Sequence, residues 1–313
     1  IRYDSALYFA EETAAIVRGL EGENTINYAK TLNNLAVSHF YLGNFKKAKF
    51  FVLKEIVLLE TLKATNNANY ICVLENASII CRKCGNHEES LDWIKKTEKH
   101  ALRIFGFNKI EYANILVSFA GVYADMGSSA NDAVFLRQAE LYYKKAEDIY
   151  KKYNDNYSRR AEIINKSNLA SYYNNSGNSP SAESLFLEVV KRCETEYGKV
   201  HPFYASALNN LAVFNYNRGD YKQAEKYFSE AIDVYQLNSS TNTILYATFI
   251  NNLGALYIEM GNYELATKMI ISAKEIMEKN NMKQHKSYAY ILNNLASDFL
   301  LNYYYSNPEN KSK

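Results

Sequence analysis

Apolar side chains recur at steps of three and four along most of the chain, which is the spacing of one face of an α-helix. Between residues 204 and 216 this apolar face consists of Tyr204, Ala205, Leu208, Leu211 and Ala212. The same spacing starts again at Ala224, and Gly219 lies between the two runs. Because glycine readily takes the left-handed conformation that ends a helix, the pattern predicts two helices joined by a tight turn.

The helix pair recurs with a period of 42 residues. Leu-Asn-Asn-Leu-Ala stands at 208–212, at 32–36 and at 292–296, and Ile-Asn-Asn-Leu-Gly stands at 250–254. In six repeats a glycine follows the second apolar anchor of this motif by eight residues, and in most a small residue comes five residues later. Two markers that move in step identify an internal repeat.

The repeat predicts an all-α fold, a single α-solenoid of antiparallel helix pairs over residues 1–313. We assign the complete pairs to residues 24–66, 67–108, 109–156, 157–198, 199–240 and 241–282. Residues 1–23 match the second helix of a preceding pair, residues 283–305 form a final partial pair, and residues 306–313 form a polar tail. The third pair is eight residues longer, and we expect its extra residues, 128–136, in the turn between its two helices.

This pattern resembles the tetratricopeptide repeat in the 42-residue form typical of kinesin light chains. The resemblance rests on residues 197–205 (Tyr-Gly-Lys-Val-His-Pro-Phe-Tyr-Ala), 208–212 and 219–228, and it extends over nearly the whole chain. It implies a right-handed superhelix in which the first helices of the pairs line a concave groove that binds a peptide or a partner protein. Such repeats occur in motor adaptors and in bacterial sensor and protease-regulator proteins, so more than one role stays open.

Helical geometry indicates which side chains face the groove, because residues at steps of four, three and four form one stripe beside the core. In the fifth repeat this stripe is Ser206, Asn210, Val213 and Asn217. The equivalent stripes are Lys30, Asn34, Val37 and Tyr41; Cys72, Asn76, Ile79 and Lys83; Asn114, Ser118, Gly121 and Asp125; Ile164, Asn168, Ser171 and Asn175; Thr248, Asn252, Ala255 and Glu259; and Tyr290, Asn294, Ser297 and Leu301. From them we select as peptide-binding candidates Lys30, Asn34, Tyr41, Asn76, Lys83, Asn168, Ser206, Asn210, Val213, Asn217, Thr248, Asn252, Glu259 and Asn294.

Asparagine occupies the second place of the stripe in six of seven repeats. Inside a helix it costs about 0.5 kcal/mol against alanine, so something offsets that cost in repeat after repeat. One interpretation is that each amide bonds the main chain of an extended peptide, since it can both donate and accept; the matching asparagine of the resembled repeats has this role. The other is that the amides bond one another or the adjacent helix and only hold the solenoid together.

Charge narrows the choice of partner. The stripe holds few charged residues, Lys30 and Lys83 in the N-terminal half and Asp125 and Glu259 further on, so we expect an uncharged or mildly amphipathic peptide. The balance of 36 Lys and Arg against 34 Asp and Glu excludes a strongly basic nucleic-acid binder. The most apolar stretch, residues 50–59, is too short to span a membrane, so we expect no membrane partner.

No catalytic or metal-binding constellation stands out. Cys81, Cys84 and His87 resemble half of a zinc site, but Cys81 takes a position that tyrosine holds in other repeats and so faces the core. Cys72 lies too far along the helix to reach the same ion, and no phosphate-binding loop or paired nucleophile and base is present. We therefore expect a protein that is not an enzyme and that binds no metal or cofactor.

The leading hypothesis is a non-enzymatic scaffold that binds a peptide or partner protein in its groove. The alternative is the sensor or regulatory part of a larger enzyme or signalling protein, such as a caspase-like protease or a nucleotide-binding switch. The chain starts at Ile1 and not at Met, which we interpret as a piece of a longer protein, and a catalytic Cys/His pair or a phosphate-binding loop outside it would favour the alternative.

Two further expectations concern compartment and assembly. Four cysteines without a secretory signal indicate a reducing compartment, the cytoplasm. The last helix has an apolar face with Leu292, Leu295 and Phe299 and no evident second helix to cover it, so self-association through this helix is also predicted.

Overall fold

The computed structural model describes residues 3–238, 241, 243–283 and 285–306, with side chains described between residues 5 and 302. Within that range it contains fourteen α-helices and no strand. They are α1 (Tyr3–Glu21), α2 (Ile26–Tyr41), α3 (Phe45–Thr61), α4 (Ala68–Lys83), α5 (His87–Ile104), α6 (Ile110–Ala130), α7 (Ala133–Tyr150), α8 (Asn156–Asn175), α9 (Ser179–Tyr197), α10 (Pro202–Asn217), α11 (Tyr221–Leu237), α12 (Ile244–Glu259), α13 (Tyr263–Lys279) and α14 (Lys286–Ser306). The predicted polar tail lies outside the described residues, apart from Ser306.

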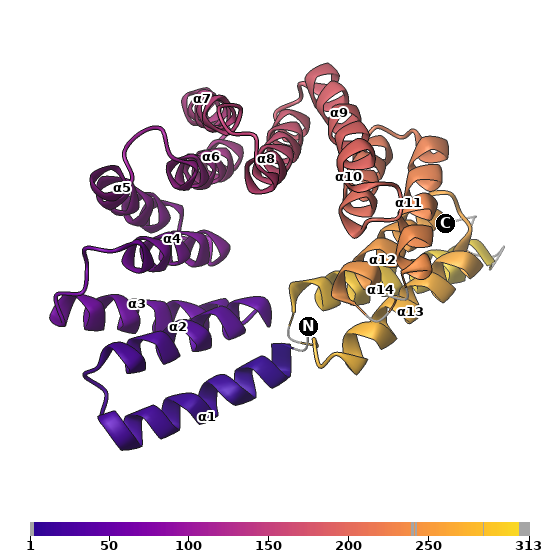
Figure 1. The fold of residues 1–313 in the computed structure, drawn as a ribbon. Coiled ribbons are helices and arrows are strands. Elements are labelled where there is room, and N and C mark those ends of the chain that lie inside the picture. The colour runs from indigo at the N-terminus through magenta and orange to yellow at the C-terminus, as the bar shows by residue number, and fades with distance from the viewer. Residues whose placement is uncertain (1–2, 239–240, 242, 284, 307–313) are drawn as a thin grey trace. The chain divides into compact units, whose positions relative to one another are not determined.

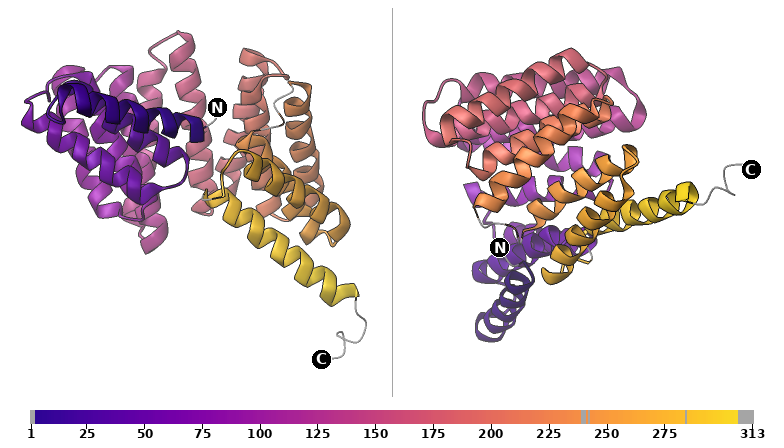
Figure 2. Two further views of the ribbon diagram at one scale, coloured as in Figure 1. Left: turned by 90° about the horizontal axis from the view of Figure 1, so that it is seen from below. Right: turned by 90° about the vertical axis from the view of Figure 1, so that its right-hand side faces the viewer.

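The helices form two compact units, one up to residue 182 and one from residue 183 onward, with α9 running from one into the other. In the first unit α2 packs on α3, α4 on α5 and α6 on α7, and in the second α10 packs on α11 and α12 on α13. Figure 1 shows α4, α6 and α8 on the inner side of the first unit and α5 and α7 on its outer side. Figure 2 shows the packed helices of each unit from two further directions. The prediction of an all-α solenoid of antiparallel pairs is confirmed within each unit.

Recurring local signals start and end the helices. The side chains of Thr25, Asn67 and Thr243 accept a hydrogen bond from the main-chain N–H three residues later and so satisfy a donor that the first helical turn leaves unpaired. Between the helices of a pair the repeat glycine has a positive φ, for example 80° at Gly43 and 78° at Gly219. A residue with a Cβ would be strained in this left-handed conformation, which explains the glycine marker.

The third pair departs from the prediction. Of residues 128–136 only Asn131 and Asp132 lie in the turn, because α6 continues to Ala130 and α7 starts at Ala133. Gly127 lies buried inside α6, where a Cβ would come within 2.6 Å of the Leu136 side chain. Asn131, with φ of 51°, reverses the chain instead. The extra residues extend the two helices because helical hydrogen bonds pair main-chain groups that a long turn would leave unpaired.

Tyrosine tethers the start of four first helices to a second helix. The rings of Tyr70, Tyr112, Tyr204 and Tyr288 are buried at one repeat position. Their hydroxyls donate to the carboxylates of Glu60 at 2.6 Å, Glu98 at 2.9 Å, Glu230 at 2.7 Å and Glu278 at 2.8 Å. Each ring fills space between helices while its polar end is satisfied, so these four tyrosines belong to the core.

Glu55, in α3, is an acidic residue inside the core. It is 1% exposed and takes the place of Ala146, Ala231 and Ala273 in other repeats. Neither of its carboxylate oxygens has a hydrogen-bond partner, and burial raises its pKa to about 8. The charged form loses its hydration without gaining a partner, so the folded protein holds Glu55 as the neutral acid at neutral pH.

This burial predicts that the Glu55→Gln variant is more stable than the native protein, by a margin that grows with pH. Between pH values of about 4.5 and 8 the folded state binds one proton more than the unfolded state, so native stability falls as pH rises through that window. The difference in unfolding free energy should increase by about 1.4 kcal/mol per pH unit from about pH 5 to 8. Urea unfolding followed by circular dichroism at several pH values measures it. Glu88→Gln, at an exposed site in α5, controls for the change in net charge; an equal pH slope in the two variants would refute the assignment.

Candidate functional site

The predicted stripe lies on the first helices, α2, α4, α6 and α8 in the first unit and α10, α12 and α14 in the second. The exposed candidates are Lys30, Asn34, Tyr41, Lys83, Asn217 and Glu259. The half-buried candidates are Asn76, Asn168, Ser206, Asn210, Val213, Thr248, Asn252 and Asn294. None of the selected side chains is sequestered in the core, so within each unit the stripe is open to a ligand.

In the second unit, stripe asparagines join neighbouring first helices. Asn252 of α12 donates through Nδ2 to Oδ1 of Asn209 at 3.1 Å, and Asn294 of α14 donates to Oδ1 of Asn251 at 3.2 Å. Asn209 and Asn251 are each 7% exposed, so both accepting oxygens lie in the core. These two stripe amides link successive repeats by hydrogen bonds, and each still has its own oxygen and a second N–H outside that bond.

In the first unit the same place of the stripe behaves differently. Ser118 of α6 donates to Oε1 of Glu75 at 2.7 Å, and burial raises the pKa of Glu75. The side chains of Asn34, Asn76 and Asn168 make no hydrogen bond to any part of the chain that the structure describes. Hydrogen bonding between repeats therefore accounts for some stripe amides and not for these three.

An ion pair lies across the stripe between α4 and α6. Nη1 of Arg82 is 3.7 Å from Oδ2 of Asp125, a stripe residue. A Cβ at Gly121, the preceding place in the stripe, would collide with the Arg82 guanidinium, so glycine gives the arginine room to lie there. The acidic member of the stripe in this unit thus has a counter-charge from the neighbouring helix.

A pocket of about 310 Å³ opens beside the stripe where α6, α7 and α8 meet. It is lined by Asn114, Val117, Tyr150, Tyr157, Arg160, Ala161, Ile164 and Asn165. Asn114 and Ile164 belong to the predicted stripe, but neither they nor the other lining residues were selected as binding candidates. The pocket lies within the first unit, beside the predicted stripe.

A chain of hydrogen bonds frames this pocket. The Tyr150 hydroxyl donates to Oδ1 of Asn114 at 2.7 Å, and Nδ2 of Asn114 donates to the Tyr157 hydroxyl at 2.8 Å. Burial, helped by nearby Tyr157, raises the pKa of Tyr150, so its hydroxyl stays protonated as the donor. Both tyrosine rings are therefore fixed relative to α6.

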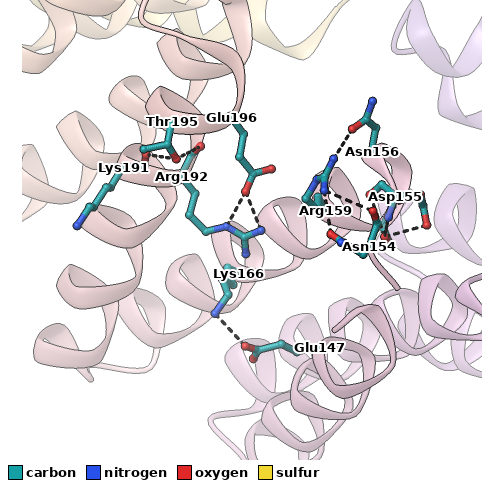
Figure 3. Close-up of polar contacts among 11 residues, drawn as sticks. Glu147, Asn154, Asp155, Asn156, Arg159, Lys166, Lys191, Arg192, Thr195 and Glu196 are labelled. Carbon is teal, nitrogen blue, oxygen red and sulfur yellow. Dashed lines mark hydrogen bonds and ion pairs between the residues drawn. The ribbon is translucent and has the colours of Figure 1, made fainter. Parts of the chain in front are cut away.

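An additional turn at the start of α8 supplies Tyr157. The helix begins at Asn156, four residues earlier in the repeat than α10, which begins at Pro202. Asp155 caps it, accepting from the main-chain N–H of Ser158 at 2.9 Å, and Arg159 bonds Asn156 of the same turn (Figure 3). The Asp-x-x-Ser capping box is the sequence signal that could have revealed this early start.

Two core positions of α8 carry polar residues. Lys166 stands where other repeats have leucine or isoleucine. Its Nζ lies 2.8 Å from Oε1 of Glu147 (Figure 3). The same carboxylate oxygen forms a second ion pair with Nζ of Lys151 at 2.7 Å. Burial alone would raise the pKa of Glu147, but the two lysines outweigh it and lower that pKa. Asn165 donates through Nδ2 to the main-chain oxygen of Tyr143 at 3.0 Å.

The residues considered for metal chemistry are not gathered into a site. Cys81 is fully buried, as predicted, whereas Cys72 is exposed. Among the described residues no three His, Cys, Asp or Glu side chains are placed to hold a metal ion. Over the same residues, no helix combines the length and apolar character needed to cross a membrane.

Residues 160–236 match the tetratricopeptide repeat family model, while none of the curated proteins matches the chain. Three solved structures share the fold. Aspartyl phosphate phosphatase F from Bacillus subtilis is 16% identical to this chain, with a TM-score of 0.57. The alignment covers 99% of this chain and 76% of the phosphatase chain. NprR in complex with its cognate peptide NprX is 15% identical to this chain, with a TM-score of 0.56. The alignment covers 97% of this chain and 83% of the NprR chain.

The third structure contains the nearly identical repeats assigned to a kinesin light chain of Podospora anserina. It is 12% identical with a TM-score of 0.53, and the alignment covers 67% of this chain and 96% of that one. These identities show the fold alone, and the family model adds the repeat signature. Residues 160–236 therefore carry the tetratricopeptide-repeat signature, and the chain shares its fold with solved tetratricopeptide-like repeats of the kinesin-light-chain type.

Proposed function

We propose that the chain is a non-enzymatic interaction scaffold that binds an extended peptide, or a segment of a partner protein, along the stripe of its first helices. The observation that carries the proposal is that Asn34, Asn76 and Asn168 present side-chain amides to solvent without a partner in the described chain. Each such amide offers donors and an acceptor that match the N–H and C=O of a peptide unit.

The spacing of the helices suits this role. Packed helices lie about 8–10 Å apart, and an extended peptide advances about 3.3 Å per residue. The second stripe place of each successive first helix would therefore meet the peptide main chain about every third residue, with an amide on α2, α4 and α8 and Ser118 on α6. Main-chain recognition of this kind gives affinity, while recesses between the amides select side chains.

The fold comparison supports the proposal in one respect. NprR, which has this fold, is known in complex with its cognate peptide. In the present chain Lys30 is exposed near the start of the stripe, whereas Asp125 has Arg82 as its counter-charge. An acidic side chain of the peptide would accordingly lie toward α2.

The Asn34→Ala, Asn76→Ala, Asn168→Ala triple variant should bind peptide about 10- to 100-fold more weakly, because each lost hydrogen bond contributes about 0.5–1 kcal/mol net. Peptides selected by the native chain from a phage-displayed random 12-residue library serve as probes, and fluorescence anisotropy gives their dissociation constants. The matched control changes Lys46, Lys95 and Lys99, exposed residues of α3 and α5, to alanine. Undiminished affinity in the asparagine variant, or an equal loss in the lysine variant, would count against the stripe.

Asparagines that bond a neighbouring repeat and asparagines proposed to bind a ligand should differ in what they contribute to the free energy of unfolding. Asn252→Ala removes the donor of the buried Asn209 oxygen and should lower the unfolding free energy by about 1–2 kcal/mol. Asn168→Ala, at the same repeat position, breaks no bond in the described chain and should change stability by less than about 0.5 kcal/mol. Urea unfolding compares the two variants. Similar losses of unfolding free energy in both would mean that Asn168 also holds neighbouring repeats together.

We further propose that copies of the chain associate through the apolar face of α14. Leu292 is 40% exposed and Phe299 52% exposed, while Leu208 and Ile250, the equivalents of Leu292 in α10 and α12, are buried. In those pairs the second helix covers this face. Large exposed apolar side chains in one row are typical of an interaction surface.

Self-association should appear as a concentration-dependent mass above 35.9 kDa in size-exclusion chromatography with light scattering. The Phe299→Glu, Leu300→Glu double variant should remain a monomer at every concentration, because two charges on this face oppose its burial. Leu237→Glu, which changes an exposed residue of α11, is the matched control. A monomeric native chain at the highest concentration would exclude this association.

A further inference from the structure

Asn165 is an amide at a repeat position that otherwise holds no amide. Its equivalents are Thr31, Val73, Ile115, Ala207, Phe249 and Ile291, all of them buried. Asn165 is fully buried as well, and its Nδ2 donates to the main-chain oxygen of Tyr143. The fold of the other repeats is built without this side chain, so packing does not explain it.

The amide oxygen of Asn165 has no hydrogen-bond partner in the described chain, although its residue lines the pocket between α6, α7 and α8. A buried acceptor without a donor lowers stability, and such atoms are rare in folded proteins. A group that enters the pocket and donates to Oδ1 would satisfy it. Because this oxygen is covered, the group must displace a side chain of the lining, and Ile164, which is 40% exposed, has room to move.

The walls of the pocket suit a flat apolar group. Val117, Ala161 and Ile164 contribute aliphatic surface, and Tyr150 and Tyr157 contribute rings that another ring can contact face-on or edge-on. The volume of about 310 Å³ lies at the lower end of pockets that hold small ligands, which span about 300–1,000 Å³. One aromatic side chain fits this space better than an extended chain.

The charges around the pocket favour a neutral occupant. No Asp or Glu lines it, so a cation would find no counter-charge inside, and the one charged residue of the lining, Arg160, already has an interaction partner within the chain. An anion would bring its charge against the acceptor oxygen of Asn165 and leave that oxygen unsatisfied. The buried pair of Lys166 and Glu147 is already matched at 2.8 Å and adds no net charge.

The rim offers a contact for a main chain. The Tyr157 hydroxyl accepts from Asn114 and has its own hydrogen left to donate. A carbonyl of a peptide lying on the stripe could accept that hydrogen while one side chain enters the pocket. Ile164, in the wall, is one helical turn before Asn168 on the same stripe.

From these contacts we infer that the pocket binds a neutral aromatic group that carries a hydrogen-bond donor, a phenol or an indole, which donates to Oδ1 of Asn165. The inference rests on the proposed function only in taking this group to be the tyrosine or tryptophan side chain of a bound peptide. The pocket itself can be tested without any peptide.

The test compares p-cresol, the tyrosine side-chain analogue, with toluene, which has the same ring and methyl group but no donor. Each is titrated into the native chain, and the methyl resonances of Val117, Ala161 and Ile164 are followed by NMR. Both should shift these methyls, with p-cresol binding about tenfold more tightly, the worth of one satisfied hydrogen bond. Equal affinities, or no shift with either compound, would overturn the inference in the native protein.

Asn165→Leu should abolish the preference for p-cresol and raise the thermal midpoint, because an apolar side chain of similar size replaces the unpaired acceptor. Asn174→Leu, at a half-buried amide of the same helix that does not line the pocket, should keep the preference and serves as the matched control. A preference retained in Asn165→Leu would overturn the role of Oδ1. If p-cresol binding persists while no peptide binds, the proposed function fails and the pocket stands; if peptides bind and p-cresol does not, the reverse holds.

Discussion

Close approach of the two helices of a pair at one small side chain is the contact on which the rest of the fold depends. Ala48, Ser90, Ala139, Ala182, Ala224 and Ala266 hold this position, and all are 0% exposed. A larger residue would force the helices apart and open the core on both sides. Each pair can bury its remaining apolar surface only against its neighbours, so the contact is needed again in every repeat. The small residue persists as Ala139 even in the third pair, where the extra residues displace it along the chain.

Polar residues at core positions are conspicuous against this repeated background, and each is accommodated differently. Glu55 keeps its proton, and Lys166 takes Glu147 as its counter-ion. Asp298, in a place that Phe214 and Leu256 hold elsewhere, accepts from the hydroxyl of Thr267. Asn165 lines a pocket and keeps an unsatisfied acceptor oxygen, and the proposed recognition of an aromatic group rests on this local irregularity of the repeat.

The position of the stripe on the first helices could be predicted because it follows from 3.6 residues per turn, and the structure leaves every selected side chain at least partly exposed. The hydrogen bonds of the stripe could not be predicted in the same way. Asn252 bonds Asn209, 43 residues earlier, yet Asn76 has Asn33 at the same offset and makes no such bond. Whether two amides meet depends on the separation and rotation of neighbouring helices to within an ångström, and the spacing of residues in the sequence does not contain that distance.

The sequence by itself determined the repeat, the helix pairs, the glycine turns and the buried face, because periodicity and turn chemistry are local properties of the chain. Only the tertiary structure decided that residues 128–130 and 133–136 extend two helices, since that outcome depends on the packing of Leu136 over Gly127. It also decided that Tyr150, Asn114 and Tyr157 meet around a pocket, because these side chains come from three helices. Contacts between helices depend on distances across the fold, and those exist only once every pair has packed on its neighbours.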